Sequence, residues 1–333
     1  MALENASAQK VYFTTTQDLL PDAMRLCGLD DFSSQQMPVK LHMGEPGNPY
    51  IIRPELVRVV VDATLAAGAK PFLLDTTVAY PGERSHKKGY ERVAVRHGFT
   101  RENVGCDVVI DDTGVRVVED GVALEVALHM YSARCMVVLS HVKGHIQAGF
   151  GGAIKNLGMG GVTKASKRRI HHMAVPVHDE ALCTLCGECA RVCPAGALAV
   201  DSEWHIDRSE CEGCGKCVLV CQPRALRVEV MSLARGLAIA ARACTRDKSV
   251  IYVNSMHQIA EGCDCDPNPG RIICPDIGYV VGTDAAAVDA ASLDMIDEVH
   301  RGVFKEYTRV DPRAQVTHAV EQGMNADYVL ECL

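Results

Sequence analysis

The sequence predicts an α/β protein whose body contains a mainly parallel sheet and is interrupted by a cysteine-rich segment. Short apolar runs alternate with helical patterns through the first half of the chain. That alternation stops near His171, where a segment dense in Cys, Gly and Pro begins and continues to about Val228. The alternation then resumes, which indicates one body with an inserted module.

In the first half, Arg53–Ala67 has apolar residues at helical spacing, with Pro54 near its start and Gly68 just after its end. We therefore expect an amphipathic helix there. Strands are expected on both sides of it, and strand, helix and strand in succession predict parallel pairing. The expected strands are Val11–Thr14, Val39–Met43, Pro71–Leu74, Asp107–Ile110 and Met136–Ser140.

The second half shows the same alternation after the insert, with buried strands expected at Val250–Asn254 and Tyr279–Val281. Helices are expected at Met231–Ala243 and Ala285–Val299. We divide the chain into a first part of the body at 1–174, an α+β insert at 175–228 and a second part of the body at 229–333.

Composition narrows the class of protein. Apolar residues make up 48% of the 333 residues and charged residues 23%, which is ordinary for a globular protein. The net charge of −8 argues against nucleic acid as a partner, because phosphate binding needs a basic face. The short basic run at Lys167–Arg169 is more typical of a solvated helix end.

Sixteen cysteines are many for this length. The first residues, MALENASAQK, lack a basic stretch followed by an apolar one, and no apolar window approaches the length of about 18 residues that predicts a membrane span. We therefore expect a cytoplasmic protein without a membrane partner, in a low-oxygen cell. In reduced cytosol, clustered cysteines indicate metal binding or catalysis.

The insert contains two copies of one cysteine pattern, 28 residues apart. In both, the cysteine spacing is x2, x2 and x3, and a proline follows the last cysteine directly or after one residue. The first copy is Cys183, Cys186, Cys189 and Cys193 followed by Pro194; the second is Cys211, Cys214, Cys217 and Cys221 followed by Gln222 and Pro223.

This pattern resembles bacterial two-cluster ferredoxins along its whole length. In that arrangement three closely spaced thiolates hold one [4Fe–4S] cluster and the fourth cysteine of each copy binds the other cluster. Gln222 is the one departure. Structural zinc is the alternative, but zinc sites usually take two Cys-x2-Cys pairs. The first cluster is assigned to Cys183, Cys186, Cys189 and Cys221, and the second to Cys211, Cys214, Cys217 and Cys193.

A glycine-rich loop with histidines and lysines follows the strand that ends near Leu139. Ligand sites of open α/β sheets lie just past the carboxyl ends of strands. His141, His145 and Lys155 are the candidate catalytic residues, since histidine exchanges protons near neutral pH and lysine pairs with anions or attacks carbonyls. Lys143 adds a fourth titratable group. Gly151, Gly152 and Asn156 are the candidate residues for binding an organic ligand.

Several stretches of the chain resemble the iron–sulfur centre proteins of the domain-of-unknown-function 362 family. The resemblance covers nearly the whole chain and implies an α/β body with a ferredoxin-like insert. It brings no established reaction. The matching stretches are Lys40–Glu45, Asp75–Tyr80 with Gly82 and Arg84, Ser140–His145, Gly151–Gly160, Cys263–Cys265 and Pro275–Gly278.

A second resemblance is local. The segment His145-Ile-Gln-Ala-Gly-Phe-Gly-Gly-Ala-Ile-Lys155 is similar to the part of lactate racemase-like proteins that carries a catalytic histidine and the lysine holding a nickel-pincer cofactor. The similarity implies that His145 and Lys155 face one cleft. The rest of that family's pattern is not evident in this chain.

A third group of cysteines lies in a Pro/Gly-rich loop of the second half. Cys263, Cys265 and Cys274 are candidate ligands of a third metal or iron–sulfur site, which Cys244 or a histidine would complete. The alternative is a set of thiols without metal, or a disulfide formed during purification.

Charged residues also follow other predicted strands. Asp75, His42, Glu45, Arg84 and His86 lie in such loops, and we expect some of them to gather at the sheet edge. At the last long helix, Asp284 is expected to be the N-cap, with Asp289 and Asp294 on an exposed face.

Two functional interpretations follow. In the first, the protein is a ferredoxin-linked oxidoreductase in which electrons from a redox partner cross the two [4Fe–4S] clusters to a small-molecule ligand beside His141, His145 and Lys155, and the histidines supply protons. In the second, it is a non-catalytic electron carrier, or an assembly factor that passes metal or sulfur to a docked protein. The sequence has no nicotinamide or flavin fingerprint of the Gly-x-Gly-x-x-Gly type.

Overall fold

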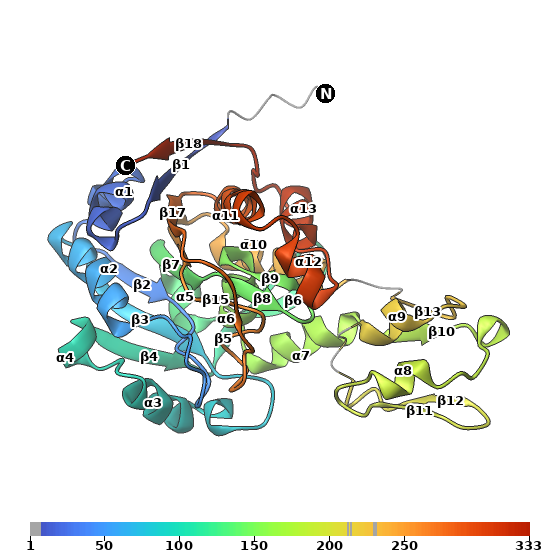
Figure 1. The fold of residues 1–333 in the computed structure, drawn as a ribbon. Helices are drawn as coiled ribbons and strands as arrows, with labels where there is room; N and C mark the ends of the chain where they lie inside the picture. Colours follow the sequence, from blue (N-terminus) through green and yellow to red (C-terminus); the bar gives the residue numbers. More distant parts are fainter. Residues whose placement is uncertain (1–7, 212, 214, 229–231) are drawn as a thin grey trace, which may run out of the picture.

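The computed structural model describes residues 8–211, 213, 215–228 and 232–333. Its centre is an eight-stranded sheet with helices on both faces (Figure 1). All neighbouring strands in it are parallel except where β17 pairs with β1 and β14, so the predicted α/β body with a mainly parallel sheet is confirmed. In sheet order the strands are β18 (Tyr328–Cys332), β1 (Gln9–Thr14), β17 (Gly278–Gly282), β14 (Ser249–Met256), β7 (Cys135–His141), β2 (Gln36–Lys40), β3 (Lys70–Thr76) and β4 (Asp107–Asp111).

The sheet separates two hydrophobic cores, which β7 illustrates. Met136 and Val138 belong to one core, whereas Val137 and Leu139 belong to the other. Burial on both faces explains why this strand is an unbroken apolar run in the sequence. The first core includes α6 (Ala153–Gly160), α10 (Leu233–Thr245), α11 (Ala285–Val299) and α13 (Ala314–Glu321); the second includes α1 (Leu20–Leu26), α2 (Pro54–Ala66) and α3 (Lys87–Arg96).

The antiparallel strand β17 follows from what connects it to β14. A parallel return needs a crossover, usually a helix. Residues 257–277 instead form turns and the short hairpin of β15 (Ile259–Ala260) and β16 (Ile272–Cys274), so the chain re-enters the sheet at the edge that it left. This connection also lays Cys263–Cys265 beside the carboxyl ends of the parallel strands.

Residues 176–228 form small elements beside the body (Figure 1). Pro176 of β10 pairs with Val228 of β13, so the two ends of this segment lie together. Few of its apolar residues, among those described, are buried: Pro176, Ala197, Leu198, Cys217, Ala225 and Leu226. The elements are β10 (Pro176–His178), α8 (Glu188–Arg191), β11 (Leu198–Val200), β12 (Trp204–Ile206), α9 (Lys216–Val220) and β13 (Leu226–Val228).

Each expected strand coincides with or overlaps a strand of the central sheet, although β2 ends at Lys40, three residues before the expected end. The helix expected from Met231 is α10, which begins at Leu233; Met231 itself lies outside the described residues. Within the described residues, no helix combines the length and the apolar character needed to cross a membrane. The remaining main elements are α4 (Arg101–Val104), β5 (Gly114–Glu119), β6 (Val122–Ala127), α5 (Leu128–Ser132), β8 (Lys143–His145), β9 (Gly149–Gly151), α7 (Lys164–Met173) and α12 (Val303–Thr308).

Candidate functional site

The carboxyl ends of β14, β7, β2 and β3 lie side by side, because these four neighbouring strands run in the same direction. Chain segments that follow or approach these ends bring polar side chains to one edge of the sheet. Among the expected site residues, His141 is the last residue of β7, His145 ends β8, and Lys155 lies on α6. All three lie near the turn that contains Cys263, Asp264 and Cys265.

Asp264 holds two of the candidate residues together. Its Oδ1 lies 2.8 Å from His141 Nδ1, and its Oδ2 accepts a hydrogen bond from Lys143 Nζ at 3.0 Å. His141 Nε2 lies 2.7 Å from the carbonyl oxygen of His257, so both ring nitrogens face acceptors. Burial raises the pKa of Asp264, but His141 and Lys143 outweigh it and lower that pKa to about 2. The carboxylate therefore fixes both side chains.

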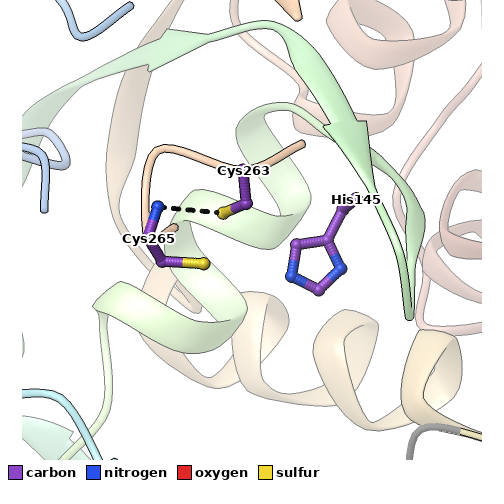
Figure 2. A group of neighbouring side chains, drawn as sticks. All are labelled: His145, Cys263 and Cys265. Atoms are coloured by element: carbon purple, nitrogen blue, oxygen red, sulfur yellow. Dashed lines mark hydrogen bonds between the residues drawn. The ribbon is translucent and has the colours of Figure 1, made fainter. Parts of the chain in front are cut away.

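Cys263, Cys265 and His145 form a compact group, in which Cys263 and His145 are buried and Cys265 is partly exposed. One ligand-type atom of each lies within 4.8 Å of the other two, and Figure 2 shows the three side chains turned toward one another. The backbone N–H of Cys265 donates to Cys263 Sγ at 3.4 Å, and Lys155 Nζ donates to the same sulfur at 3.5 Å. Cys263 is thus surrounded by hydrogen-bond donors.

These donors determine which sulfur is ionised. The hydrogen bond from the Cys265 thiol is the main cause that lowers the pKa of Cys263, and the charge of Lys155 and a hydrogen bond from His145 add to it against the effect of burial. The same contact raises the pKa of Cys265. In turn, the Cys263 thiolate raises the pKa of Lys155 despite burial. These contacts therefore favour the thiolate form at Cys263, the thiol form at Cys265 and the charged form of Lys155.

His145 has a defined role in this group. Its Nδ1 accepts hydrogen bonds from the backbone N–H groups of Gln147 at 3.2 Å and Ala148 at 3.1 Å. Because Nδ1 uses its lone pair, the ring proton is on Nε2, the nitrogen left for the hydrogen bond to Cys263. Burial, and then the charge of Lys155, lower the pKa of His145. His145 is therefore a neutral hydrogen-bond donor to sulfur.

The glycine-rich loop leads into the N-terminus of α6, where Asp289 of α11 takes the free N–H groups. Asp289 Oδ1 accepts from Ala153 N at 2.7 Å, and its Oδ2 accepts from Ile154 N at 2.9 Å. Burial raises the pKa of Asp289 to about 6. The expectation that Asp289 lies on an exposed face is wrong: it is 1% exposed and caps a neighbouring helix.

The expected ligand-binding residues pack against these groups. A Cβ on Gly152 would lie 2.3 Å from Asp289 Oδ1, and one on Gly151 would lie 3.3 Å from Cε of Lys143. Asn156 Oδ1 accepts from Lys40 Nζ at 2.6 Å, while its Nδ2 donates to Leu139 O and Ser140 Oγ, each at 3.0 Å. The two glycines thus permit close packing, and Asn156 connects α6 to β2 and β7.

Lys40 and Asp75 form a buried ion pair at the ends of β2 and β3. Lys40 Nζ lies 3.0 Å from Asp75 Oδ1, and the Tyr90 hydroxyl donates to the other carboxylate oxygen. Burial lowers the pKa of Lys40, with Asp75 opposing the shift. The expectation that Lys167 lies on a solvated helix end is wrong: its buried Nζ donates to Thr76 Oγ1 at 2.6 Å and Thr77 O at 2.5 Å.

Three of the other expected loop residues gather at one point. The buried guanidinium of Arg84 donates to Glu45 Oε2 at 2.5 Å and to His42 Nε2 at 2.8 Å. Burial, and then the charge of Arg84, hold the pKa of His42 well below its usual value. His86 instead is exposed and contacts the hydroxyl of Ser85.

The insert brings its cysteines together around two small hollows. Cys183, Cys186, Cys189 and Cys221 line one of them. Cys193, Cys211 and Cys217 line the other. Cys214, the remaining residue of the second set, lies outside the described residues. The cysteines that share a cavity thus come from both sequence copies, as the crossed assignment requires.

The other cysteines of the expected third site lie apart from the compact group. Cys274 is opposite Ile259 in the β15–β16 hairpin, and Cys244 is buried on α10 with its Sγ 4.0 Å from Leu157 O. Burial raises the pKa of Cys244 to about 12. The group of three potential ligands found in the described part of the chain contains His145 with Cys263 and Cys265.

Comparison with known protein families shows to which family this chain belongs. The model of the domain of unknown function DUF362 matches residues 38–294. This range includes the cysteine-rich segment and the candidate site residues at the carboxyl ends of the parallel strands. The chain belongs to the DUF362 family. A search of curated proteins found no match.

Two solved structures are similar to this DUF362 protein. The lactate racemase apoprotein from Thermoanaerobacterium thermosaccharolyticum is 11% identical, with a TM-score of 0.40, over 77% of this chain and 52% of that one. A protein from Thermotoga maritima is 10% identical, with a TM-score of 0.44, over 89% of this chain and 59% of that one. The matched part is thus about half to three fifths of each of those proteins.

Sequence reasoning missed the organising residue of this DUF362 site. Asp264 has no motif of its own beyond its place between two cysteines, and its partners His141 and Lys143 are more than 100 residues away in the chain. Its one signal is that a charged residue interrupts a cysteine pair within a family-matching stretch. The roles of Lys40, which lies in a family-matching stretch, and of Lys167, which lies in a short basic run, were likewise not visible.

Proposed function

We propose that this DUF362 protein is an iron–sulfur electron-transfer protein. The two cysteine sets of the insert hold two [4Fe–4S] clusters, and electrons pass from a ferredoxin-type partner to a ligand beside His145 and Lys155. The protein is then an oxidoreductase whose chemistry takes place at the carboxyl edge of the sheet.

The observation that carries the proposal is the sorting of the cysteines into two cavities. Each cavity is lined by cysteines of both sequence copies. A tetrahedral zinc site would instead use two Cys-x2-Cys pairs. Thiolates in this crossed arrangement suit a pair of cubane clusters, which supply one-electron chemistry when bound.

In the insert, the chain supplies the ligands and a dry lining. Trp204 belongs to the small core beside Cys189, and its ring stacks on His178 with 4.5 Å between ring centroids. Apolar cover and backbone N–H groups around thiolates set the potential of such sites. One example is the Leu185 N–H, which lies 3.4 Å from Cys183 Sγ.

In the body, the chain supplies charge and orientation. Lys155 is the cation nearest to the Cys263 thiolate and is partly exposed, so its remaining donors can meet an acidic group of a ligand. His141 is held between Asp264 and a backbone carbonyl, and His145 donates to sulfur. The two histidines therefore orient groups at the site.

Anaerobic purification followed by iron, sulfide and zinc analysis tests the proposal. We expect about eight irons and eight sulfides per chain, as two cubanes require. Cys189→Ala should lose about half of this iron. Cys332→Ala is the matched control, because Cys332 is an exposed cysteine of β18, outside the insert, and should keep it all. Two zinc ions and no sulfide would contradict the proposal.

A second measurement separates an oxidoreductase from a carrier. The anaerobic protein is denatured and its released small molecules are identified by mass spectrometry. An anionic organic molecule that is retained by the wild type and lost from Lys155→Met, with iron content unchanged, supports a ligand site. Full iron content without any such molecule in either protein favours the non-catalytic carrier.

A further inference from the structure

The turn at Cys263 brings two thiols into position to react with each other. The N–H of Asp266 donates to the carbonyl oxygen of Cys263 at 2.9 Å, which closes a β-turn over Cys263–Asp266. The turn brings Cys263 and Cys265, which are separated by one residue, closer together. Their side chains point to the same space (Figure 2), and their sulfurs lie within 4.8 Å. A disulfide needs closely approaching Cβ atoms, and a turn that brings the two sulfurs this near favours that approach.

The surroundings of the pair favour sulfur chemistry over a bound cation. The Lys155 ammonium lies 3.5 Å from Cys263 Sγ, where its charge stabilises a thiolate and repels a metal ion. His145 Nδ1 is occupied by two backbone N–H groups, so Nε2 carries the proton and has no lone pair for a metal. Asp264, the carboxylate between the cysteines, is bound to His141 and Lys143.

We propose that Cys263 and Cys265 are a redox-active pair that cycles between a dithiol and an internal disulfide. On oxidation the S–S bond forms, and two electrons leave together with the protons bound to the two sulfurs. On reduction the S–S bond breaks, two electrons enter, and the protons return to the sulfurs from solvent. Cys265 is partly exposed, which gives these protons a path to solvent.

The pair would serve as a two-electron store at the site. Two one-electron carriers of the [4Fe–4S] class balance both directions: in the reduced form each gives one electron to the disulfide, and in the oxidised form each takes one electron from the dithiol. This source of electrons rests on the proposed function, whereas the dithiol chemistry itself does not. His145 and Lys155 are positioning residues in this step, because they act through the Cys263 sulfur.

The sequence provides a direct test by mass spectrometry. Trypsin cleavage after Lys248 and Arg271 releases residues 249–271, which contain Cys263 and Cys265 and no other cysteine. Full-length anaerobic protein is equilibrated in buffers with varied ratios of reduced to oxidised dithiothreitol, quenched in acid, alkylated and digested. We expect the peptide to convert from a doubly alkylated form to an unalkylated form that has lost two hydrogens, about 2 Da. The ratio of the two forms should change tenfold for about 30 mV of buffer potential, as for a two-electron couple.

Matched variants make the test specific. Cys263→Ser and Cys265→Ser should each abolish the conversion, and Cys274→Ser should leave it unchanged, because Cys274 lies in the neighbouring hairpin and outside the peptide. Double alkylation across the whole range of buffers would overturn the proposal. So would a stoichiometric metal ion, beyond the iron of the insert, that is lost from Cys263→Ser.

Failure of this proposal is distinguishable from failure of the proposed function. The double variant Cys189→Ala and Cys217→Ala should lack the iron of the insert and still convert in dithiothreitol buffers. Dithionite-reduced ferredoxin should reduce the pair in the wild type at least tenfold faster than in this double variant. Equal rates would leave the pair redox-active but remove its link to the clusters, and absence of iron from the wild type would remove the proposed function alone.

Discussion

The two cysteine-rich regions of this molecule place the same side chain in opposite surroundings. The described residues that line the two cavities of the insert include no lysine, arginine or histidine. Cys263 in the body instead has Lys155 and His145 as hydrogen-bond partners, with Lys143 nearby on Asp264. The two regions therefore differ in the charged groups that surround their sulfur atoms.

This difference determines how negative charge on sulfur is balanced. Cysteines that share a cavity without cations ionise together only where a metal centre neutralises them. A single thiolate beside an ammonium group and a neutral imidazole is already neutralised, and is then available as a nucleophile or an electron store. Cysteine spacing alone therefore does not identify the chemistry of a site; the nearest cations do.

The largest expected effect is on the insert when metal is removed. Its core contains few fully buried apolar residues, whereas each core of the body contains several helices and strands. A segment that buries so little apolar surface needs a further source of stability, which a metal centre provides. Oxidation and chelation should therefore abolish amide-exchange protection in β10–β13 and leave β7 protected. Protection retained in both regions would remove this contrast.

In the body, the largest expected effect of one substitution is at Asp264. Asp264→Ala removes the carboxylate partner of the buried cation Lys143 and of His141, so we expect a loss of about 3–5 kcal/mol in the free energy of unfolding. Asp62→Ala, which breaks an exposed ion pair with Arg58, is the control and should cost less than about 1 kcal/mol. Urea denaturation of both variants measures the difference, and equal losses would show that the buried network contributes little.

Much of the fold was predictable because β-strands buried on both faces leave an unmistakable apolar pattern. Met136–Ser140 and Val250–Asn254 are such runs, and both fall within central strands. The reversed direction of β17 was not predictable, because it depends on residues 257–277 folding without a helix. A pattern of short apolar runs specifies strands but not the direction in which each one enters the sheet.

The site was predictable only in its list of reactive side chains. His145, Lys155 and Cys263 were each singled out, but their meeting depends on a turn that approaches from a distant segment. Asp264 and Asp289 were missed or misassigned for a related reason, since both bind groups more than 100 residues away. Long-range hydrogen bonds of buried carboxylates have no periodic signature in a sequence.

A smaller effect should appear in the pH dependence of stability. Burial, with the charges of Lys40 and Arg84 nearby, lowers the pKa of Lys167 to about 7, with Asp75 opposing the shift. Above pH 7 the folded protein releases this proton while the unfolded chain, with a lysine pKa near 10.4, keeps it. The unfolded state then binds more protons, so stability rises with pH, by about 2 kcal/mol from pH 7 to pH 9.

The variant Lys167→Met isolates this contribution, because methionine fills a similar space without a charge. Its free energy of unfolding, measured with urea at pH 7 and pH 9, should lack the rise of about 2 kcal/mol that the same linkage predicts for the wild type. If the free energy of unfolding changed with pH in the same way for both proteins, Lys167 would be charged in the folded state. The carboxylates at this edge of the sheet would then neutralise the lysines more fully than the contacts indicate.

The smallest expected effect is that of replacing Lys155. This substitution tests the contrast between the two cysteine-rich regions most directly, because it removes the cation that distinguishes Cys263 from the cysteines of the insert. Lys155→Met leaves the Cys263 thiolate with the Cys265 and His145 donors but without the ammonium at 3.5 Å. Because the reduced pair carries the thiolate and the disulfide does not, loss of the cation should favour the disulfide, by about five- to tenfold at a fixed ratio of dithiothreitol forms.

Lys155→Arg keeps the charge and should restore most of the wild-type ratio, which a purely structural role of Lys155 would not predict. The same peptide of residues 249–271 reports both variants, and an unchanged ratio in Lys155→Met would mean that hydrogen bonds rather than charge hold the thiolate.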